Sequence, residues 1–284
     1  MVDQAVKLPE LFALFGQPVA GNPTQEMIEA AFRARGLNWR YLTIEVAPEE
    51  LEDAILGMRA MGFLGVNITK PHKIKVIPYL DRLTEAAAKI GAVNCIKLEK
   101  QELLGENTDG KGFLESLQTV IEPAGKQVVL LGAGGAARAI GVELALAGVK
   151  QIAVVNRDHN RGIELARLLS EDVGTNAQYI HWDGTYLVPS STDILINATS
   201  VGMDDAYAQL PLDMKELREG TISADVVFNP ADTLFLRQAR SAGCTTLDGL
   251  GMLVNQGVIG FRLWTGLEPD KDAMRVAMEE ALGS

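Results

Sequence analysis

Cysteine, histidine and long apolar runs are all scarce in this 284-residue sequence. Cys95 and Cys244 lie far apart and in no metal-binding spacing, so we expect a reducing compartment and no disulfide. The three histidines, His72, His159 and His181, form no HxH or HExxH pattern, and we therefore expect no metal site. No run of about 18 apolar residues and no charged-then-apolar leader occurs, which predicts a cytoplasmic protein without a membrane partner.

Positive charge is also in short supply. The chain has 26 Lys and Arg against 37 Asp and Glu, a formal net charge of −11. This balance argues against binding to nucleic acid or to an anionic membrane through bulk electrostatics. It still allows a local cationic patch for a phosphorylated cofactor. The length suggests two domains rather than one, and the 47% of hydrophobic residues is ordinary for a globular protein.

Strand-like and helix-like segments alternate along most of the chain. The pattern predicts strands at 39–46, 64–68, 92–99, 126–132, 151–156, 193–198 and 222–228, and helices at 48–62, from about 111, at 135–148 and at 161–170. Repeated strand-then-helix order indicates an α/β fold of parallel sheets covered on both faces, and we expect the sheet of the N-terminal domain to be mainly parallel. The Gly-, Asn- and Asp-rich stretch "GENTDGKG" predicts a domain break near 109–112.

A glycine-rich loop follows the apolar strand "VVLLG". Gly132, Gly134 and Gly135, with Ala133 and Ala136 between and after them, lie between this strand and a predicted helix. Glycines let a pyrophosphate approach the backbone, and the helix N-terminus offers unpaired N–H groups. The stretch therefore predicts a dinucleotide site. A glycine-rich turn without a ligand is the alternative.

The next strand ends at Asn156, where an NAD-binding domain usually has an acid. Arg157 and Arg161 follow and could hold a 2′-phosphate through charge-assisted hydrogen bonds, which favours NADP. Asp158 lies between them and could accept from a ribose hydroxyl, so NAD stays an alternative. A second alternative is that both arginines are solvated surface cations.

Polar side chains follow several predicted strands of the N-terminal half. They are Asn67, Thr69 and Lys73 after the first, Asn94 in "GAVN", and Asn107, Thr108 and Asp109 in "GENTDG". Ligands of open α/β sheets bind at the carboxyl ends of strands, and amides and hydroxyls suit a small polyhydroxylated substrate. Each residue also has a structural alternative: a turn cap for Asn94, an Asx-turn for Asp109 and a solvated amine for Lys73.

A series of motifs resembles the shikimate dehydrogenase family, which includes quinate/shikimate dehydrogenases. The matching stretches are "GQPV" (16–19), "GVNITKPHK" (65–73), "GAVN" (91–94), "NTDGKG" (107–112), "GAGGAA" (132–137), "NR" (156–157), "NATSVGM" (197–203), "DGLGMLVNQ" (248–256) and "WTG" (264–266). The resemblance implies a substrate domain at 1–109, an NADP-binding Rossmann domain at 110–248, and C-terminal helices at 249–284 that return to the first domain.

The same resemblance implies roles for individual residues. Lys73 and Asp109 would be the catalytic pair, and Thr69, Asn94 and Gln256 would bind substrate hydroxyls, with Asn67 close by. The implied cofactor-binding residues are Gly132, Ala133, Gly134, Gly135, Ala136, Asn156, Arg157, Asp158, Arg161, Thr199, Val226, Gly249 and Met252. The implied reaction is reversible hydride transfer between NADP and a ring hydroxyl, as in aromatic amino acid biosynthesis. A non-catalytic NADP(H) sensor on the same scaffold is the alternative.

The chain departs from the family where the substrate carboxylate binds. Asn22 and Thr24 replace the usual Ser-x-Ser pair, and Phe228 replaces a strand-end tyrosine. We therefore expect retained chemistry with weak shikimate activity, or a differently substituted cyclic polyol or hydroxy-acid substrate. One alternative is that Thr24 only caps a helix and Asn22 only forms a turn. Another is a biosynthetic shikimate dehydrogenase that tolerates the altered loop. The sequence leaves a monomer and a homodimer equally open.

Overall fold

The structure is a computed structural model that describes residues 8–203 and 205–283. It divides into two compact units, Met1–Asn107 with Gly257–Ser284, and Thr108–Gln256. These units differ from the expected segments at their borders. The second change of unit falls inside helix α8 (Leu250–Thr265), after Gln256, and not at Gly249.

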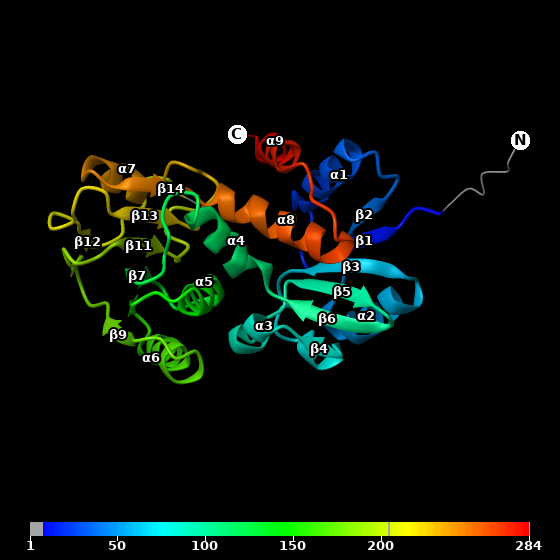
Figure 1. The fold of residues 1–284 in the computed structure, drawn as a ribbon, viewed down its shortest axis with the longest axis horizontal. Helices are drawn as coiled ribbons and strands as arrows, with labels where there is room; N and C mark the ends of the chain where they lie inside the picture. Colours follow the sequence, from blue (N-terminus) through cyan, green and yellow to red (C-terminus); the bar gives the residue numbers. More distant parts are fainter. Residues whose placement is uncertain (1–7, 204, 284) are drawn as a thin grey trace, which may run out of the picture. The chain divides into compact units, whose positions relative to one another are not determined.

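The first unit contains a six-stranded sheet in the order β2-β1-β3-β5-β6-β4 (Figure 1). Its strands are β1 (Leu11–Gly16), β2 (Arg40–Glu45), β3 (Phe63–Ile68), β4 (Arg82–Leu83), β5 (Cys95–Glu99) and β6 (Glu102–Glu106). Strands β1, β2 and β3 run parallel, but β5 is antiparallel to both β3 and β6. The sheet is therefore mainly parallel, as expected, and β5 is the strand that runs against the others.

A two-residue turn explains the antiparallel pair. Lys100 and Gln101 connect β5 to β6 with φ angles of 50° and 72°, so both lie in the left-handed region. Such turns match the twist of a hairpin but usually carry Asn or Gly. Because Lys and Gln stand there instead, no local pattern marks the hairpin, and sequence analysis does not predict strand β6.

The two faces of this sheet carry different cores. One face packs aliphatic residues such as Val66 and Ile96 against α2 (Leu51–Ala60), which continues the short 3₁₀ turn Pro48–Glu50. The other face carries an aromatic cluster of Phe12, Phe32, Trp39, Phe261 and Trp264. The remaining helical elements of the unit are α1 (Thr24–Ala34), the 3₁₀ turn Ile77–Tyr79, α3 (Glu85–Ile90) and α9 (Lys271–Leu282), with α9 beside α1 in Figure 1.

Gly65 permits the aromatic face to pack closely. The indole of Trp264 lies directly over it, so that a Cβ atom built there would meet the ring at 2.3 Å. Trp264 Nε1 donates to the carbonyl of Ile96 on β5 at 2.9 Å, which fixes the ring on the sheet.

Edge strand β2 is covered by side chains of α1. The backbone N–H of Thr43 donates to Gln25 Oε1 at 3.1 Å, and that of Tyr41 donates to Glu29 Oε1 at 3.4 Å. The two acceptors are one helical turn apart, which matches the spacing of alternate N–H groups along a strand.

The second unit is a parallel six-stranded sheet in the order β14-β13-β11-β7-β8-β9. Its strands are β7 (Gln127–Leu131), β8 (Gln151–Asn156), β9 (Ala177–His181), β11 (Ile194–Asn197), β13 (Ile222–Asp225) and β14 (Thr245–Leu247), with a separate pair β10 (Tyr186–Leu187) and β12 (Leu212–Asp213). This is the dinucleotide-binding, Rossmann arrangement, and the order reverses between β7 and β11, where ligands of such sheets bind.

Helices α4 (Thr108–Leu117), α5 (Gly135–Leu146), α6 (His159–Arg167) and α7 (Leu234–Ser241) belong to this unit, and a π-helical turn, Leu168–Asp172, extends α6. The stretch 109–112, where the sequence predicts a domain break, belongs to the start of α4, which begins three residues earlier than the predicted helix. Gly110 and Gly112 are packing glycines, because a Cβ atom there would lie 2.4 Å from Ala139 O and 2.7 Å from Met252 O. Similarly, β13 ends at Asp225 and not at 228.

Candidate active site

Asn22 and Thr24 lead into α1. Asn22 Oδ1 accepts from the backbone N–H of Thr24 at 3.0 Å, so Asn22 is a turn residue as one alternative held. Thr24 is the first helical residue and the cap position is Pro23, so a capping role for the Thr24 hydroxyl is wrong. Because Asn22 Oδ1 is engaged, the turn leaves the Nδ2 amide group of this side chain for a ligand.

Hydrogen bonds tie together the loops that follow β1, β2 and β3. Gln17 N–H donates to Lys70 O at 2.9 Å, and Val46 N–H donates to Gly16 O at 2.9 Å. Thr69 N–H donates to Phe15 O at 2.9 Å, which holds this predicted ligand at the end of β3. The three strand ends therefore form one connected surface at the carboxyl edge of the sheet.

Asn67 is held by a buried chain of hydrogen bonds. Tyr41 Oη donates to Asn67 Oδ1 at 2.7 Å, and Asn67 Nδ2 donates to the backbone carbonyl of Asn94 at 3.1 Å. A carbonyl only accepts, so the amide orientation is fixed and the tyrosine must donate. Burial, with Cys95 as a smaller cause, raises the pKa of Tyr41 well above its usual value, which keeps this donor protonated.

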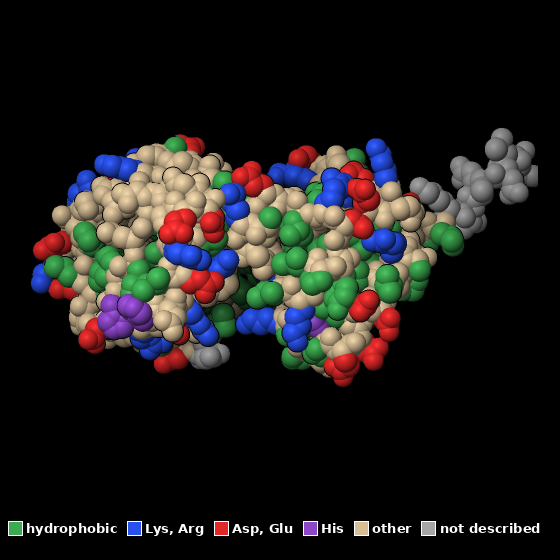
Figure 2. Space-filling view, turned by 90° about the horizontal axis from the view of Figure 1, so that it is seen from below, with side chains coloured by type: hydrophobic (Ala, Val, Ile, Leu, Met, Phe, Trp, Pro, Cys, Tyr) green, Lys and Arg blue, Asp and Glu red, His purple; other side chains and the backbone are tan. Residues whose placement is uncertain are grey.

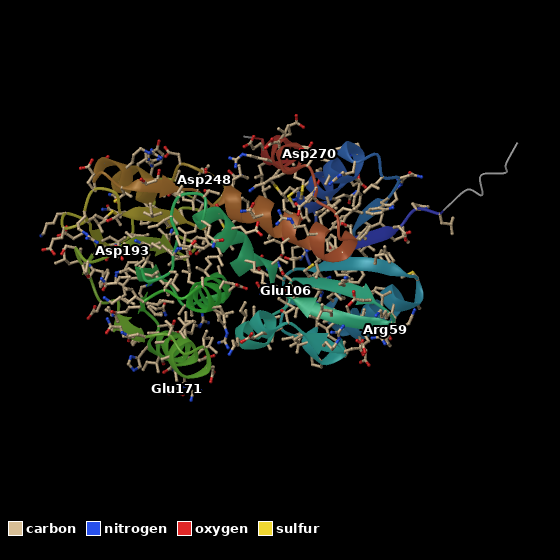
Figure 3. All side chains as sticks on the ribbon, viewed as in Figure 1. Arg59, Glu106, Glu171, Asp193, Asp248 and Asp270 are labelled. Carbon is tan, nitrogen blue, oxygen red and sulfur yellow. The ribbon has the colours of Figure 1, made fainter. Side chains whose placement is uncertain are left out.

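The antiparallel strands bring further polar residues to the same edge. Asn94 precedes β5, and Asn107 follows β6, so both lie where β3 ends. Asn107 Nδ2 donates to Ala92 O at 3.1 Å. Glu106, which ends β6 (Figure 3), is buried and accepts from Thr84 Oγ1 and from the N–H of Asn107, each at 2.8 Å. The polar strand ends thus form a hydrogen-bonded framework.

Lys73 lies in a loop that is fixed on both sides. His72 is fully buried and its Nε2 donates to Val46 O at 2.8 Å. The carbonyl of Lys73 accepts from Val93 N–H at 2.7 Å. The half-buried lysine side chain therefore projects from a rigid segment next to Asn94.

Three predicted substrate-side residues belong to the second unit. Asp109 is in the first turn of α4, and Gln256 is a buried residue of α8 whose backbone lies against Gly112. Phe228 is half-buried in the loop after β13 and offers an apolar ring where the family has a phenol hydroxyl.

The glycine loop after β7 suits a pyrophosphate. Gly132 has φ 106°, and a Cβ atom there would lie 3.0 Å from Ala198 O. Within the described part of the chain, a Cβ atom built on Gly134 or Gly135 meets no heavy atom within 4 Å, and no side chain caps α5. An open backbone and an uncapped helix N-terminus are the features that receive phosphate groups, so these residues fit the dinucleotide.

The residues after β8 are more constrained than expected. Asp158 caps α6 by accepting from Arg161 N–H at 3.0 Å, and its carboxylate pairs with Arg161 Nε at 3.7 Å. This capping role weakens the proposal that Asp158 binds a ribose hydroxyl. Asn156 Nδ2 donates to Asp158 O at 2.8 Å, and Arg157 is exposed.

A buried network holds the loops after β11 and β13. Asp225 accepts from Asn197 Nδ2 at 2.9 Å, from Val227 N–H at 3.0 Å and from Thr233 Oγ1 at 2.7 Å. Burial raises the pKa of Asp225 to about 6, and these hydrogen bonds oppose the rise. Thr199 Oγ1 donates to Asn197 Oδ1 at 2.7 Å, so the network reaches a predicted cofactor residue.

Gly249 anchors the start of α8 beside the same loop. Its N–H donates to Val227 O at 3.2 Å, and a Cβ atom would lie 2.5 Å from Val226 O. Met252, one turn further along, meets α4 at Gly112. Gly249, Val226 and Met252 therefore lie on neighbouring segments of the second unit.

The structure gathers the predicted residues into two sets. The first unit holds Asn22, Thr24, Asn67, Thr69, Lys73 and Asn94, and the second holds Asp109, Phe228, Gln256 and all the predicted cofactor-binding residues. Sequence reasoning missed Tyr41 and Asp225, because a strand aromatic and a strand-end acid carry no distinguishing pattern. Across residues 8–203 and 205–283, no cluster of three metal-ligating side chains is present. Nor is any helix in those ranges long and apolar enough to cross a bilayer.

Comparison with known families gives consistent matches along the chain. Residues 14–96 match the shikimate dehydrogenase substrate binding domain, residues 115–203 match shikimate / quinate 5-dehydrogenase, and residues 249–279 match the shikimate 5'-dehydrogenase C-terminal domain. The shikimate dehydrogenase (NADP(+)) of Moorella thermoacetica is 43% identical over 278 residues, which cover 96% of this chain and 94% of the relative.

Solved structures give two informative neighbours. The shikimate 5-dehydrogenase of Thermus thermophilus, solved with NADP(H) and shikimate, is 36% identical with a TM-score of 0.82, covering 96% of this chain and 99% of that one. The ligand-free 5-ketofructose reductase of Gluconobacter sp. strain CHM43 is 48% identical with a TM-score of 0.94, covering 96% and 99%. The chain therefore belongs to the shikimate dehydrogenase family and is an NADP-dependent oxidoreductase of that type.

Proposed function

We propose that this enzyme reduces a neutral, polyhydroxylated ketone such as 5-ketofructose with NADPH, in preference to a carboxylate-bearing ring such as 3-dehydroshikimate. The main observation behind this proposal is a change of three residues. Asn22, Thr24 and Phe228 stand at the positions where the family binds the substrate carboxylate. Loss of one hydrogen bond to a charged group costs about 1.5–3 kcal/mol, which is roughly tenfold to a hundredfold in affinity.

The loop chemistry supports a neutral ligand. The stretch from Gly16 to Gln25 contains no Lys or Arg that could balance a carboxylate. The oriented Nδ2 group of Asn22 suits a hydroxyl or carbonyl oxygen, and the Phe228 ring suits a C–H surface. The 48% identity to a 5-ketofructose reductase, against 36% and 43% to the two shikimate dehydrogenases above, points the same way.

The proposed chemistry uses residues of both units. NADPH, when bound, supplies the hydride to the carbonyl carbon of the substrate. Lys73 donates a hydrogen bond, and then a proton, to the carbonyl oxygen as its π electrons become an alkoxide lone pair. Asp109 orients the lysine and an adjacent substrate hydroxyl. Thr69, Asn94 and Gln256 bind the remaining hydroxyls, and Asn67 supports them.

The direct test is a substrate panel with the purified full chain. 5-Ketofructose and 3-dehydroshikimate would be reduced with NADPH or NADH, and shikimate and quinate oxidised with NADP or NAD, while cofactor absorbance is followed. We expect the highest kcat/KM for 5-ketofructose with NADPH. A higher kcat/KM for 3-dehydroshikimate would identify a biosynthetic shikimate dehydrogenase and contradict the proposal.

Restoring the carboxylate contacts gives a second test. The double substitution Asn22→Ser with Phe228→Tyr should lower the KM for shikimate by about tenfold to a hundredfold. It should raise the KM for 5-ketofructose, because the amide donor is lost. An unchanged KM for shikimate would show that these positions do not recognise the carboxylate.

The proposal also assigns roles in cofactor binding to residues of the second unit. We infer that the glycine loop Gly132–Gly135 with Ala136 binds the pyrophosphate, and that Asn156, Arg157 and Arg161 bind the 2′-phosphate. The residues that would line the nicotinamide side are Thr199, Val226, Gly249 and Met252. A non-catalytic sensor is disfavoured by relatives that are named as enzymes.

We also infer a cytoplasmic location. Cys95 and Cys244 are both buried and belong to different units, which suits a reducing compartment. A monomer and a homodimer are both compatible with the proposed reaction, because every residue invoked for it belongs to one chain.

A further inference from the structure

Two histidines and a tyrosine meet at the end of β9, beside the end of β8. His181 is paired with Asn156 in the strand register, so it lies next to the proposed 2′-phosphate residues. The ring of His159, the first residue of α6, lies 5.3 Å from that of Tyr179 and 6.3 Å from that of His181. Figure 2 shows a purple histidine patch on the surface of this unit, on the left.

Hydrogen-bond chemistry fixes the tautomer of His181. Tyr179 Oη lies 3.1 Å from Asn156 O and 2.7 Å from His181 Nδ1. The hydroxyl has one proton, and the carbonyl of Asn156 can only accept, so Tyr179 donates to Asn156. His181 Nδ1 must then be the donor to the tyrosine oxygen. In the neutral ring this leaves a lone pair on Nε2.

We propose that His181 is a specificity residue for NADP, whose protonation accompanies binding of the 2′-phosphate. An exposed Nε2 lone pair repels a phosphate oxygen, whereas the protonated ring presents an N–H donor and a positive charge. NAD lacks the phosphate, so its binding has no such proton uptake. The inference concerns the cofactor alone and does not depend on which ketone is the substrate.

The charged neighbours are consistent with this assignment. Asp158 directs its carboxylate to the N-terminus of α6 and to Arg161, so it is not available as a fixed partner for His181. Burial, followed by the charge of Asp158, raises the pKa of Tyr179, which keeps the tyrosine a neutral donor. The ionisable side chains whose rings lie against that of His181 are His159 and Tyr179, and the charge of Asp158 acts on Tyr179.

The test is the pH dependence of cofactor affinity without substrate. Kd values of NADPH and NADH would be measured by cofactor fluorescence between about pH 5.5 and 8.5 for the wild type, His181→Gln and His159→Gln. Uptake of a proton together with the 2′-phosphate makes NADPH affinity fall as pH rises, by up to tenfold for each pH unit.

As pH rises across this range, NADPH should lose affinity relative to NADH, so the ratio of the Kd for NADH to the Kd for NADPH should fall. We expect this fall to be about tenfold larger for the wild type than for His181→Gln. Titration of the 2′-phosphate itself is common to both proteins and cancels in this comparison. His159→Gln is expected to keep the wild-type slope. Equal slopes in the wild type and His181→Gln overturn the proposal, as does a slope that survives His181→Gln and disappears in His159→Gln.

Discussion

Among individual side chains, the Tyr41 hydroxyl holds Asn67, a proposed substrate-side residue, in place through a hydrogen bond. It is fully buried and gives its only proton to Asn67, so Tyr41→Phe leaves an amide oxygen without its donor. We expect a loss of about 1–3 kcal/mol in unfolding free energy, measured by urea denaturation. We also expect a higher KM for the ketone with an unchanged Kd for NADPH.

Tyr186 offers a matched control for that substitution. Its hydroxyl is buried but has no hydrogen-bond partner among the residues that the structure describes, so Tyr186→Phe removes a polar atom that makes no bond there. This variant should be as stable as the wild type or more so, with unchanged KM values. Equal losses in both variants would show that the Tyr41 hydrogen bond has no special role.

Asp225 makes stability depend on pH. Its pKa rises from an ordinary value of 3.8 to about 6 in the folded chain, so the folded state holds the proton more tightly. Its contribution to the unfolding free energy is therefore most favourable below about pH 4, and about 3 kcal/mol of it is lost as pH rises through and beyond 6. Comparing Asp225→Asn with the wild type in urea denaturation at several pH values isolates this slope. Thr233→Val removes a hydrogen-bond donor to the Asp225 carboxylate, which raises the pKa of Asp225 further. The loss of stability with rising pH should therefore extend to higher pH in this variant.

Among the strands and loops, two glycines should respond oppositely to a methyl group. Gly65→Ala forces a Cβ atom against the Trp264 indole and should lower the unfolding free energy by about 1–3 kcal/mol or more. Gly134→Ala meets no described atom within 4 Å, so stability should hold while the Kd for NADPH rises. Thermal unfolding and fluorescence titration of both variants would reveal the contrast. NADPH binding that survives Gly134→Ala would remove this loop from the cofactor site.

The β5–β6 turn is a second element with a measurable effect. Lys100 and Gln101 occupy left-handed conformations that Asn and Gly adopt at lower cost. We expect Lys100→Asn with Gln101→Gly to raise the unfolding free energy by about 1 kcal/mol without changing kcat. A decrease measured by urea denaturation would mean that the lysine or glutamine side chain stabilises the hairpin.

The same elements separate what sequence patterns predict from what they do not. Alternating strands and helices, the glycine loop after β7 and the polar end of β3 follow from local patterns. The β5–β6 hairpin does not, because its turn lacks the residues that usually mark one. Gly110 and Gly112 predict a domain break and also permit helix packing, and Asp158, a predicted ribose ligand, also caps a helix. In each case one residue type serves two structural purposes, and only the three-dimensional neighbours decide between them.

Across the full chain, the residues proposed for substrate chemistry and those proposed for cofactor binding belong mainly to different units. Lys73 belongs to the first unit and the glycine loop to the second. We expect Lys73→Met to lower kcat by about 10²-fold to 10⁴-fold while the Kd for NADPH stays within about twofold. Lys75→Met, an exposed lysine of the same loop, is the matched control and should keep full activity. Equal activity of the two variants would remove Lys73 from the catalytic role.

The side chains of α1 that cover edge strand β2 also bear on self-association of the protein. An open sheet border is a template onto which another polypeptide can add by backbone pairing. Here Gln25 and Glu29 already engage two of the N–H groups along that border. Sheet extension by a second molecule would first have to displace both, so self-association through this border is disfavoured and the chain is protected against fibrillar growth from it.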